Sequence, residues 1–116
     1  MGVMYYAEYL HLFERGRNEY IRDRGISYAE IEKKGLILPV REVECRYRSP
    51  CRYDELVWVR IGIGELNRAS LRFIYQILNE DKRICLAEGN TQHALVNTDL
   101  KPVRIPEWLR DLLKKA

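Results

Sequence analysis

Apolar residues recur at three- and four-residue spacing near the start of the chain, and this pattern predicts a long amphipathic helix over residues 4–24. Its apolar stripe consists of Tyr6, Tyr9, Leu10, Phe13, Tyr20 and Ile21. Gly16 lies inside this helix, although glycine in a helix interior costs about 1 kcal/mol relative to alanine. We therefore expect Gly16 to lie where the helix approaches something flat, such as a sheet, and Gly25 to end the helix.

Two shorter helices are predicted further along the chain. Ser27, with Glu30 three residues later, has the pattern of a capping box, so a brief helix is expected over residues 28–34. Near the end of the chain, Pro106 precedes a second short helix over residues 107–115.

Between residues 36 and 96 the pattern changes to the alternation of apolar and polar positions that is typical of β-strands. Four strands are predicted, over residues 36–48, 55–66, 69–78 and 82–96, and we expect Gly89 to kink the last one. In the second strand Gly62 and Gly64 lie opposite the apolar face, where they would leave room for a helix or ligand. Short links between consecutive strands predict an antiparallel meander with the long helix packed across it, in one α+β domain over residues 1–116.

The composition changes this picture little. The chain of 116 residues is 47% hydrophobic, which favours a globular domain, and its 20 Lys and Arg against 17 Asp and Glu give a net charge of only +3. That charge is too weak a signal to propose nucleic acid as a partner, and a solvated surface explains it more simply than an attraction for phosphates. No apolar run reaches the ~20 residues of a membrane span and no signal peptide is evident, so a cytoplasmic protein is expected.

The cysteines do not indicate a metal site. Cys45, Cys51 and Cys85 form an odd set without paired spacing, and no histidines cluster with them. Reduced thiols in the cytoplasm fit this pattern best. Because no base is evident beside them, we expect small buried side chains and not nucleophiles.

The most specific motif stands at the start of the chain and reads Gly2-Val3-Met4-Tyr5-Tyr6-Ala7-Glu8-Tyr9-Leu10, followed by Phe13-Glu14-Arg15. Weaker segments follow in order: Ser49-Pro50, Tyr53-Asp54-Glu55-Leu56, Asn67-Arg68-Ala69-Ser70-Leu71-Arg72-Phe73, Ala87-Glu88-Gly89-x-Thr91-x-His93 and Ile105-Pro106. Through these segments residues 2–113 resemble the 4-hydroxybenzoyl-CoA thioesterase family of hotdog-fold proteins, the YbgC-like acyl-CoA thioesterases. The resemblance implies an α+β hotdog fold, a long helix wrapped by an antiparallel sheet, here without the family's first strand.

The resemblance also implies an activity. The protein would hydrolyse a short- or medium-chain, or an aromatic, acyl-CoA to the free acid and CoA, with no cofactor and no metal. The CoA nucleotide would suit the weakly basic surface. The family acts as homodimers or homotetramers with sites at the subunit interface, and without the first strand, strand 55–66 would be an exposed edge that favours association. The alternatives are a non-catalytic module that binds acyl thioesters or a partner protein, and a hotdog dehydratase, whose His-containing helix motif is not visible here.

The start of the long helix is the expected active site, because free N–H groups there favour negative charge. The resemblance implies that the backbone N–H of Tyr6 faces the thioester carbonyl as an oxyanion donor. The substrate-binding positions that it implies are Gly2, Val3, Met4, Tyr5, Tyr9 and Glu14. The family's catalytic Asp stands three residues before Gly2, where this chain has only Met1, so hydrolysis is expected to be impaired. Either Met1 is an internal residue of a longer natural protein, or the chain is naturally short and not a thioesterase.

The other titratable residues near the motif are expected to be structural. Glu8 and Glu14 are the nearest carboxylates, and a place on the helix surface beside an Arg or Lys is expected for both. His93 is expected to have a structural role on the last strand, and His11 to lie on the helix surface.

Overall fold

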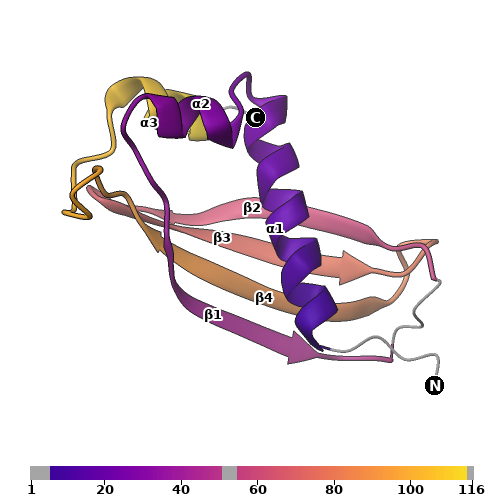
Figure 1. Cartoon of the computed structure of the whole chain (residues 1–116). Coiled ribbons are helices and arrows are strands. Elements are labelled where there is room, and N and C mark those ends of the chain that lie inside the picture. The colour runs from indigo at the N-terminus through magenta and orange to yellow at the C-terminus, as the bar shows by residue number, and fades with distance from the viewer. Residues whose placement is uncertain (1–5, 51–54, 115–116) are drawn as a thin grey trace.

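The computed structural model describes residues 6–50 and 55–114 of the chain. Its elements, in chain order, are α1 (Tyr6–Asp23), α2 (Tyr28–Lys33), β1 (Val40–Tyr47), β2 (Trp58–Leu66), β3 (Ser70–Leu78), β4 (Cys85–Ala94) and α3 (Glu107–Lys114) (Figure 1). Every predicted helix and strand is present, and the strands are shorter than predicted. The expected turn at 51–54 lies outside the described residues. No helix in the described part of the chain is both long and apolar enough to cross a membrane.

The four strands form one antiparallel sheet in the order β1-β4-β3-β2, so only β2, β3 and β4 make the predicted meander. The prediction that β1 pairs with β2 is wrong, because β1 lies beside β4, with Val43 opposite Thr91 and Tyr47 opposite Ala87. A tight hairpin needs a link of about two to five residues. More residues than that separate β1 from β2 in the sequence, and the two strands are opposite edges of the sheet. β2 is the other edge of the described sheet, as expected.

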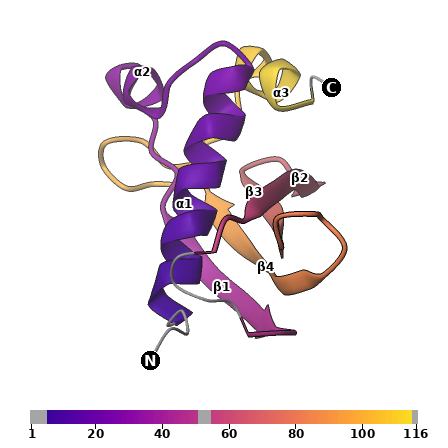
Figure 2. The ribbon, with the colours of Figure 1, turned by 90° about the vertical axis from the view of Figure 1, so that its right-hand side faces the viewer.

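α1 crosses the inner face of the sheet and contacts one strand after another (Figures 1 and 2). Near its start, Tyr9 contacts Tyr47 at the end of β1, with ring centroids 5.1 Å apart. One turn later, Phe13 stacks on Tyr75 of β3, with 4.3 Å between centroids and 10° between the ring planes. After a further turn, Gly16 reaches β2. The apolar stripe predicted from the sequence is therefore the face of α1 that packs on the sheet.

The contact at Gly16 confirms that this glycine lies where α1 approaches the sheet. A Cβ atom on Gly16 would lie 2.5 Å from Cδ1 of Ile61 and 2.9 Å from Cγ1 of Val59. The helix does not occupy the space expected at Gly62 and Gly64, and room for a ligand at these glycines stays a prediction. A Cβ on Gly62 would meet nothing within 4 Å, and one on Gly64 would meet the side chain of Ile74 on the neighbouring strand. Gly64 therefore makes room for a strand neighbour, and neither glycine admits the helix.

Gly89 does not kink β4, in contrast to the prediction. It pairs in unbroken register with Cys45 on β1 and Tyr75 on β3. A Cβ atom there would collide with the backbone oxygen of Glu44 and would lie 3.0 Å from the ring of Phe13. Gly89 is thus the point where a side chain is left out so that Phe13 can lie on the sheet.

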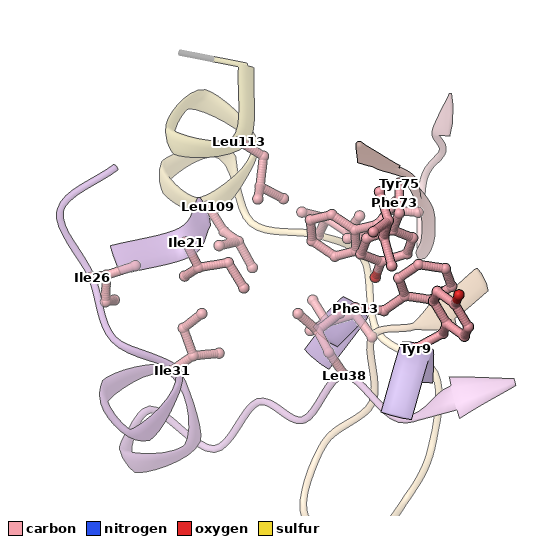
Figure 3. Close-up of a cluster of buried hydrophobic side chains, with 14 of the residues drawn as sticks. Tyr9, Phe13, Ile21, Ile26, Ile31, Leu38, Phe73, Tyr75, Leu109 and Leu113 are labelled. Atoms are coloured by element: carbon pink, nitrogen blue, oxygen red, sulfur yellow. The ribbon is translucent and has the colours of Figure 1, made fainter. Parts of the chain in front are cut away.

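α2 and α3 close one end of the core beside the last turns of α1 (Figure 2). The predicted capping box is confirmed, because the Ser27 hydroxyl accepts from the Glu30 N–H and the Glu30 carboxylate accepts from the Ser27 N–H, each at 3.2 Å. Gly25 follows α1 with a φ of +106°, a conformation that glycine adopts without steric cost. Figure 3 shows buried side chains of all three helices in one cluster: Ile21, Ile31, Leu109 and Leu113.

Candidate active site

The expected active site lies at the start of α1, whose first described residue is Tyr6. In general, the N–H groups in the first turn of a helix have no partner within the helix, and the helix dipole favours negative charge beside them. An oxyanion can be stabilised by donors of this kind. The expected positions Gly2, Val3, Met4 and Tyr5 lie outside the described residues, as does the side chain of Tyr6.

An aromatic wall formed by Tyr9 and Tyr47 stands beside this helix start. Tyr9 is 2% exposed, whereas Tyr47 is 52% exposed, and their rings are tilted by 60° to each other. Sequence reasoning missed Tyr47, although the strand alternation puts it on the same face as Cys45. Burial raises the pKa of the Cys45 thiol above its ordinary value, and a hydrogen bond with Tyr47 partly offsets this. A thiol that stays protonated is a poor nucleophile, as expected for Cys45.

The two nearest carboxylates lie apart from the aromatic wall. Glu14 is exposed on α1, so its substrate-binding role stays a prediction. Glu8 is half-buried and lines a groove of about 910 Å³ between α1 and β2, together with Leu12 and Val59. The structure therefore directs Glu8 toward β2, whereas Tyr9 faces β1. His11 is exposed on α1, as expected.

A cluster of three arginines is the second feature with binding chemistry. Arg68, Arg104 and Arg110 line a pocket of about 390 Å³ with Leu66 and Asn67. Arg110 donates to the carbonyl oxygen of Asn67 at 2.7 Å. Within the described residues, none of the three forms an ion pair with a carboxylate, so their charges are available to an anionic ligand. The cluster was not predicted, because only the fold brings these distant positions together.

The turn between β2 and β3, which contributes Arg68 to the cluster, and the start of α1 lie toward opposite ends of the sheet (Figure 1). Tyr47, beside the helix start, pairs with Ala87 on β4. Leu66, in the arginine pocket, pairs with Leu71, which pairs with His93 on β4. From position 87 to position 93 a strand rises about 20 Å, at about 3.3 Å per residue. One chain therefore holds the two features about 20 Å apart along the sheet.

His93 lies under α1 and cannot reach a ligand at either end. It is fully buried, and both ring nitrogens are bonded, Nδ1 to the carbonyl oxygen of Leu38 at 3.0 Å and Nε2 to Oγ1 of Thr91 at 2.8 Å. Thr91 also bonds the hydroxyl of Tyr75 at 2.6 Å, and Arg17 donates to that hydroxyl at 3.1 Å. Burial is the main cause that lowers the pKa of His93 to about 4; the bond to Leu38 opposes this shift, and the nearby charge of Arg17 contributes to it. His93 has the structural role expected of it.

Comparison with known proteins identifies the family. The model of the thioesterase-like superfamily matches residues 1–113. This chain belongs to the thioesterase-like superfamily. The putative acyl-CoA thioesterase YneP of Bacillus subtilis is 30% identical over 112 residues, which are 93% of this chain and 81% of YneP.

Solved structures agree with this assignment. The crystal structure of a hypothetical protein from Aquifex aeolicus matches with a TM-score of 0.91 at 32% identity, over 97% of this chain and 87% of that one. A DHNA-CoA thioesterase from Staphylococcus aureus matches with a TM-score of 0.86 at 33% identity, over 96% of this chain and 74% of that one. The α+β arrangement of this member of the thioesterase-like superfamily is the hotdog fold, with α1 across the antiparallel sheet, which confirms the resemblance of residues 2–113 to that family.

Proposed function

We propose that this protein hydrolyses an acyl-CoA thioester, with a short- or medium-chain or an aromatic acyl group, to the free acid and CoA. The observation that carries the proposal is that α1, described from Tyr6 onward, packs across the inner face of the sheet in a member of the thioesterase-like superfamily. The names of the Bacillus subtilis relative and the Staphylococcus aureus neighbour support CoA as the thiol part of the substrate.

In the proposed reaction, water adds to the thioester carbonyl carbon and the carbonyl oxygen becomes negatively charged. The N–H of Tyr6 and the dipole of α1 stabilise that oxygen, and one such donor is typically worth about 3 kcal/mol in the transition state. The C–S bond then breaks, the acid leaves, and the proton from water passes to the CoA sulfur. The acyl thioester is proposed to lie against the motif residues Gly2, Val3, Met4, Tyr5, Tyr9 and Glu14. The half-exposed ring of Tyr47 offers an apolar surface to the acyl group.

The arginine cluster supports a nucleotide-bearing substrate. CoA carries a pyrophosphate and a further phosphate, and arginine recognises such groups through charge-assisted hydrogen bonds. Since Arg68 and Arg110 lie at the far end of the sheet from their own Tyr6, we propose that they serve the site of a second subunit. Antiparallel pairing of two β1 edges would bring the cluster end of one sheet toward the α1 start of the other.

The β1 edge has the properties such a homodimer requires. Val40, Val43 and Tyr47 on this edge strand are 42%, 48% and 52% exposed, respectively. Apolar side chains and unpaired backbone groups on one edge favour pairing with another strand. A homodimer, or a tetramer of two such dimers, would build each site from two chains.

The free thiols of Cys45 and Cys85 support a cytoplasmic location for the protein.

The test is thiol release from a panel of benzoyl-, hexanoyl- and decanoyl-CoA, with the matching pantetheine thioesters, which lack the nucleotide. Arg68→Gln and Arg110→Gln should each lower kcat/KM for the CoA thioesters about tenfold and leave the pantetheine thioesters nearly unchanged. Arg83→Gln is the matched control, because the Arg83 side chain is 84% exposed on another turn. Absence of hydrolysis across the panel would contradict the proposed activity. Equal losses on both substrate types would contradict the role of the cluster.

The same assay distinguishes the non-catalytic alternative. Tight binding of acyl-CoA without turnover would favour a binding module. A version with an added N-terminal segment that places Asp three residues before Gly2 should then gain about 10²–10⁴-fold in rate if general-base catalysis is the missing component. No gain in that version would favour a binding function.

A further inference from the structure

Four polar side chains and one carbonyl under α1 form a continuous hydrogen-bond chain whose protons can be assigned. The carbonyl oxygen of Leu38 can only accept, so Nδ1 of His93, at 3.0 Å, carries a proton and donates it. In a neutral ring Nε2 is then an acceptor, and it accepts from the Thr91 hydroxyl at 2.8 Å. The Thr91 oxygen in turn accepts from the hydroxyl of Tyr75 at 2.6 Å.

The other end of the chain is fixed as well. A guanidinium group has donors and no acceptor, so Nη1 of Arg17 donates to the Tyr75 oxygen at 3.1 Å. All the protons therefore point from α1 toward Leu38, with an obligate donor at one end and an obligate acceptor at the other. Tyr75 and His93 are fully buried and Thr91 is 3% exposed, so an unmatched donor inside the chain is costly.

A charged His93 is incompatible with this direction. Imidazolium donates from both nitrogens, so Nε2 would donate to the Thr91 oxygen. If Thr91 then donates to Tyr75, the Tyr75 proton is turned toward Arg17, and two donors face each other. If Tyr75 keeps its direction, the Thr91 proton has no acceptor in the chain. In either case one buried donor loses its partner.

We propose that this chain couples the protonation of His93 to the attachment of α1: with neutral His93 every donor of the chain has an acceptor, including Arg17 of α1, and with charged His93 either Arg17 or Thr91 must lose its acceptor. Tyr75 and Thr91 are positioning residues that transmit the effect through the directions of their hydroxyl protons. This coupling is a property of the core and does not depend on hydrolysis. α1 also carries the candidate oxyanion donor at its start. Protonation of His93 in acid would therefore loosen the candidate site as well.

The groups that face His93 come from four parts of the fold. α1 presents the guanidinium of Arg17, whose charge opposes a second positive charge. β4 contributes Thr91, which links His93 to the hydroxyl of Tyr75 on β3. β3 also contributes the ring of Phe73, which lies edge-on to the imidazole with 5.4 Å between the ring centroids. The segment before β1 presents the carbonyl of Leu38. Direct repulsion by Arg17 and coupling through the chain both predict that removing Arg17 raises the pKa of His93, so the experiment must separate them.

A double-mutant cycle read by NMR titration of His93 separates the two effects. Arg17→Met should raise the pKa of His93 by about one unit, because the Tyr75 hydroxyl is then free to reverse and a like charge is lost. In a Tyr75→Phe background the chain is cut but the charge is still present, so Arg17→Met should give a clearly smaller shift. Arg17→Lys keeps a charged, donor-only group and should leave the pKa low.

Tyr28→Phe is the matched control, because it removes a tyrosine hydroxyl that bonds the N–H of Leu38 outside the chain. It should not change the response to Arg17→Met. Equal shifts in the wild-type and Tyr75→Phe backgrounds would overturn the coupling and leave only charge repulsion. If acid unfolds the protein before His93 titrates, the pH dependence of the unfolding free energy of the same four proteins gives the same comparison through linkage.

Discussion

The ring of Phe13 on α1 lies nearly parallel to the ring of Tyr75 on β3, with 10° between their planes and 4.3 Å between their centroids. The hydroxyl of the same Tyr75 bonds Thr91 in the core. The ring of Tyr75 therefore packs against α1, and its hydroxyl oxygen belongs to the hydrogen-bond chain that runs from Arg17 to Leu38. This stack depends on Gly89, which leaves the space that the Phe13 ring occupies.

Gly89→Ala should destabilise the fold by about 1–3 kcal/mol or more, because the added methyl group would meet the backbone of Glu44 and the ring of Phe13. The backbone cannot withdraw without breaking the pairing of β1 with β4. Gly62→Ala is the control in a strand, since its Cβ would meet nothing within 4 Å, and it should be neutral or slightly stabilising. Urea unfolding measures both. Equal stability of the two variants would contradict the close approach at Gly89.

Gly16→Leu should destabilise by about 1–3 kcal/mol through overpacking against β2, despite the better helix propensity of leucine. The closest atom is Cδ1 of Ile61, at 2.5 Å from a Cβ on Gly16. Ile61→Ala makes room, so the double variant should lose less than the sum of the two single variants. Thermal melts of all four proteins give the coupling. Strict additivity would show that the two residues do not meet.

Stability should fall as the pH is lowered from about 6.5 to about 4. His93 has a pKa of about 4 when folded against an ordinary value of 6.5, so the unfolded chain binds more protons between these values. The contribution of neutral His93 is fully present above pH 6.5 and is lost as the pH approaches 4, a change of about 3 kcal/mol. Unfolding free energies at pH 7, 5.5 and 4 test this. His93→Gln should flatten this part of the curve, and an unchanged slope in that variant would assign the effect to other groups.

An oligomer is expected at tens of micromolar, and its interface can be located with two charge substitutions. Val43→Glu puts a third carboxylate beside Glu42 and Glu44 on the β1 edge and should shift the protein toward monomer. Leu56→Glu changes a residue that is 69% exposed at the groove beside β2 and should leave the oligomer intact if β1 is the interface. Light scattering reads both variants. The reverse result would place the interface at β2, and a wild-type monomer would contradict association altogether.

Local patterns predicted much of the fold, because they report which face of an element is buried. The periodicity of α1 and the glycine at position 16 predicted the contact of the helix with the sheet, and alternation predicted the strands, although not that the contact is with β2. The neighbour of β1 was not predictable, because alternation assigns a face to a strand but not a partner. Gly89 was misread because a glycine looks the same whether it bends a strand or admits a ring.

The candidate site was predictable only where its chemistry is local in the sequence. A helix that starts within the opening motif was predicted from its periodicity, and α1 is described there from Tyr6 onward. The arginine cluster joins Arg68, Arg104 and Arg110 from three separate segments, and no spacing along the chain signals it. Likewise, the two-residue spacing of Thr91 and His93 puts both on one strand face, but Arg17 and Leu38 become their partners only after folding.

The pairing of β1 with β4 has a consequence for synthesis on the ribosome. β1 ends at Tyr47, whereas its partner strand begins at Cys85, so the chain that separates them must emerge before β1 gains a neighbour. Contacts between distant segments form late, and a nascent chain exposes its apolar surface until they do. The inner face of α1 and the side chains of β1 would therefore stay exposed during translation until β4 has been synthesised. A pause in translation before residue 85 would prolong that interval, in which chaperones and wrong partners compete for the same surface.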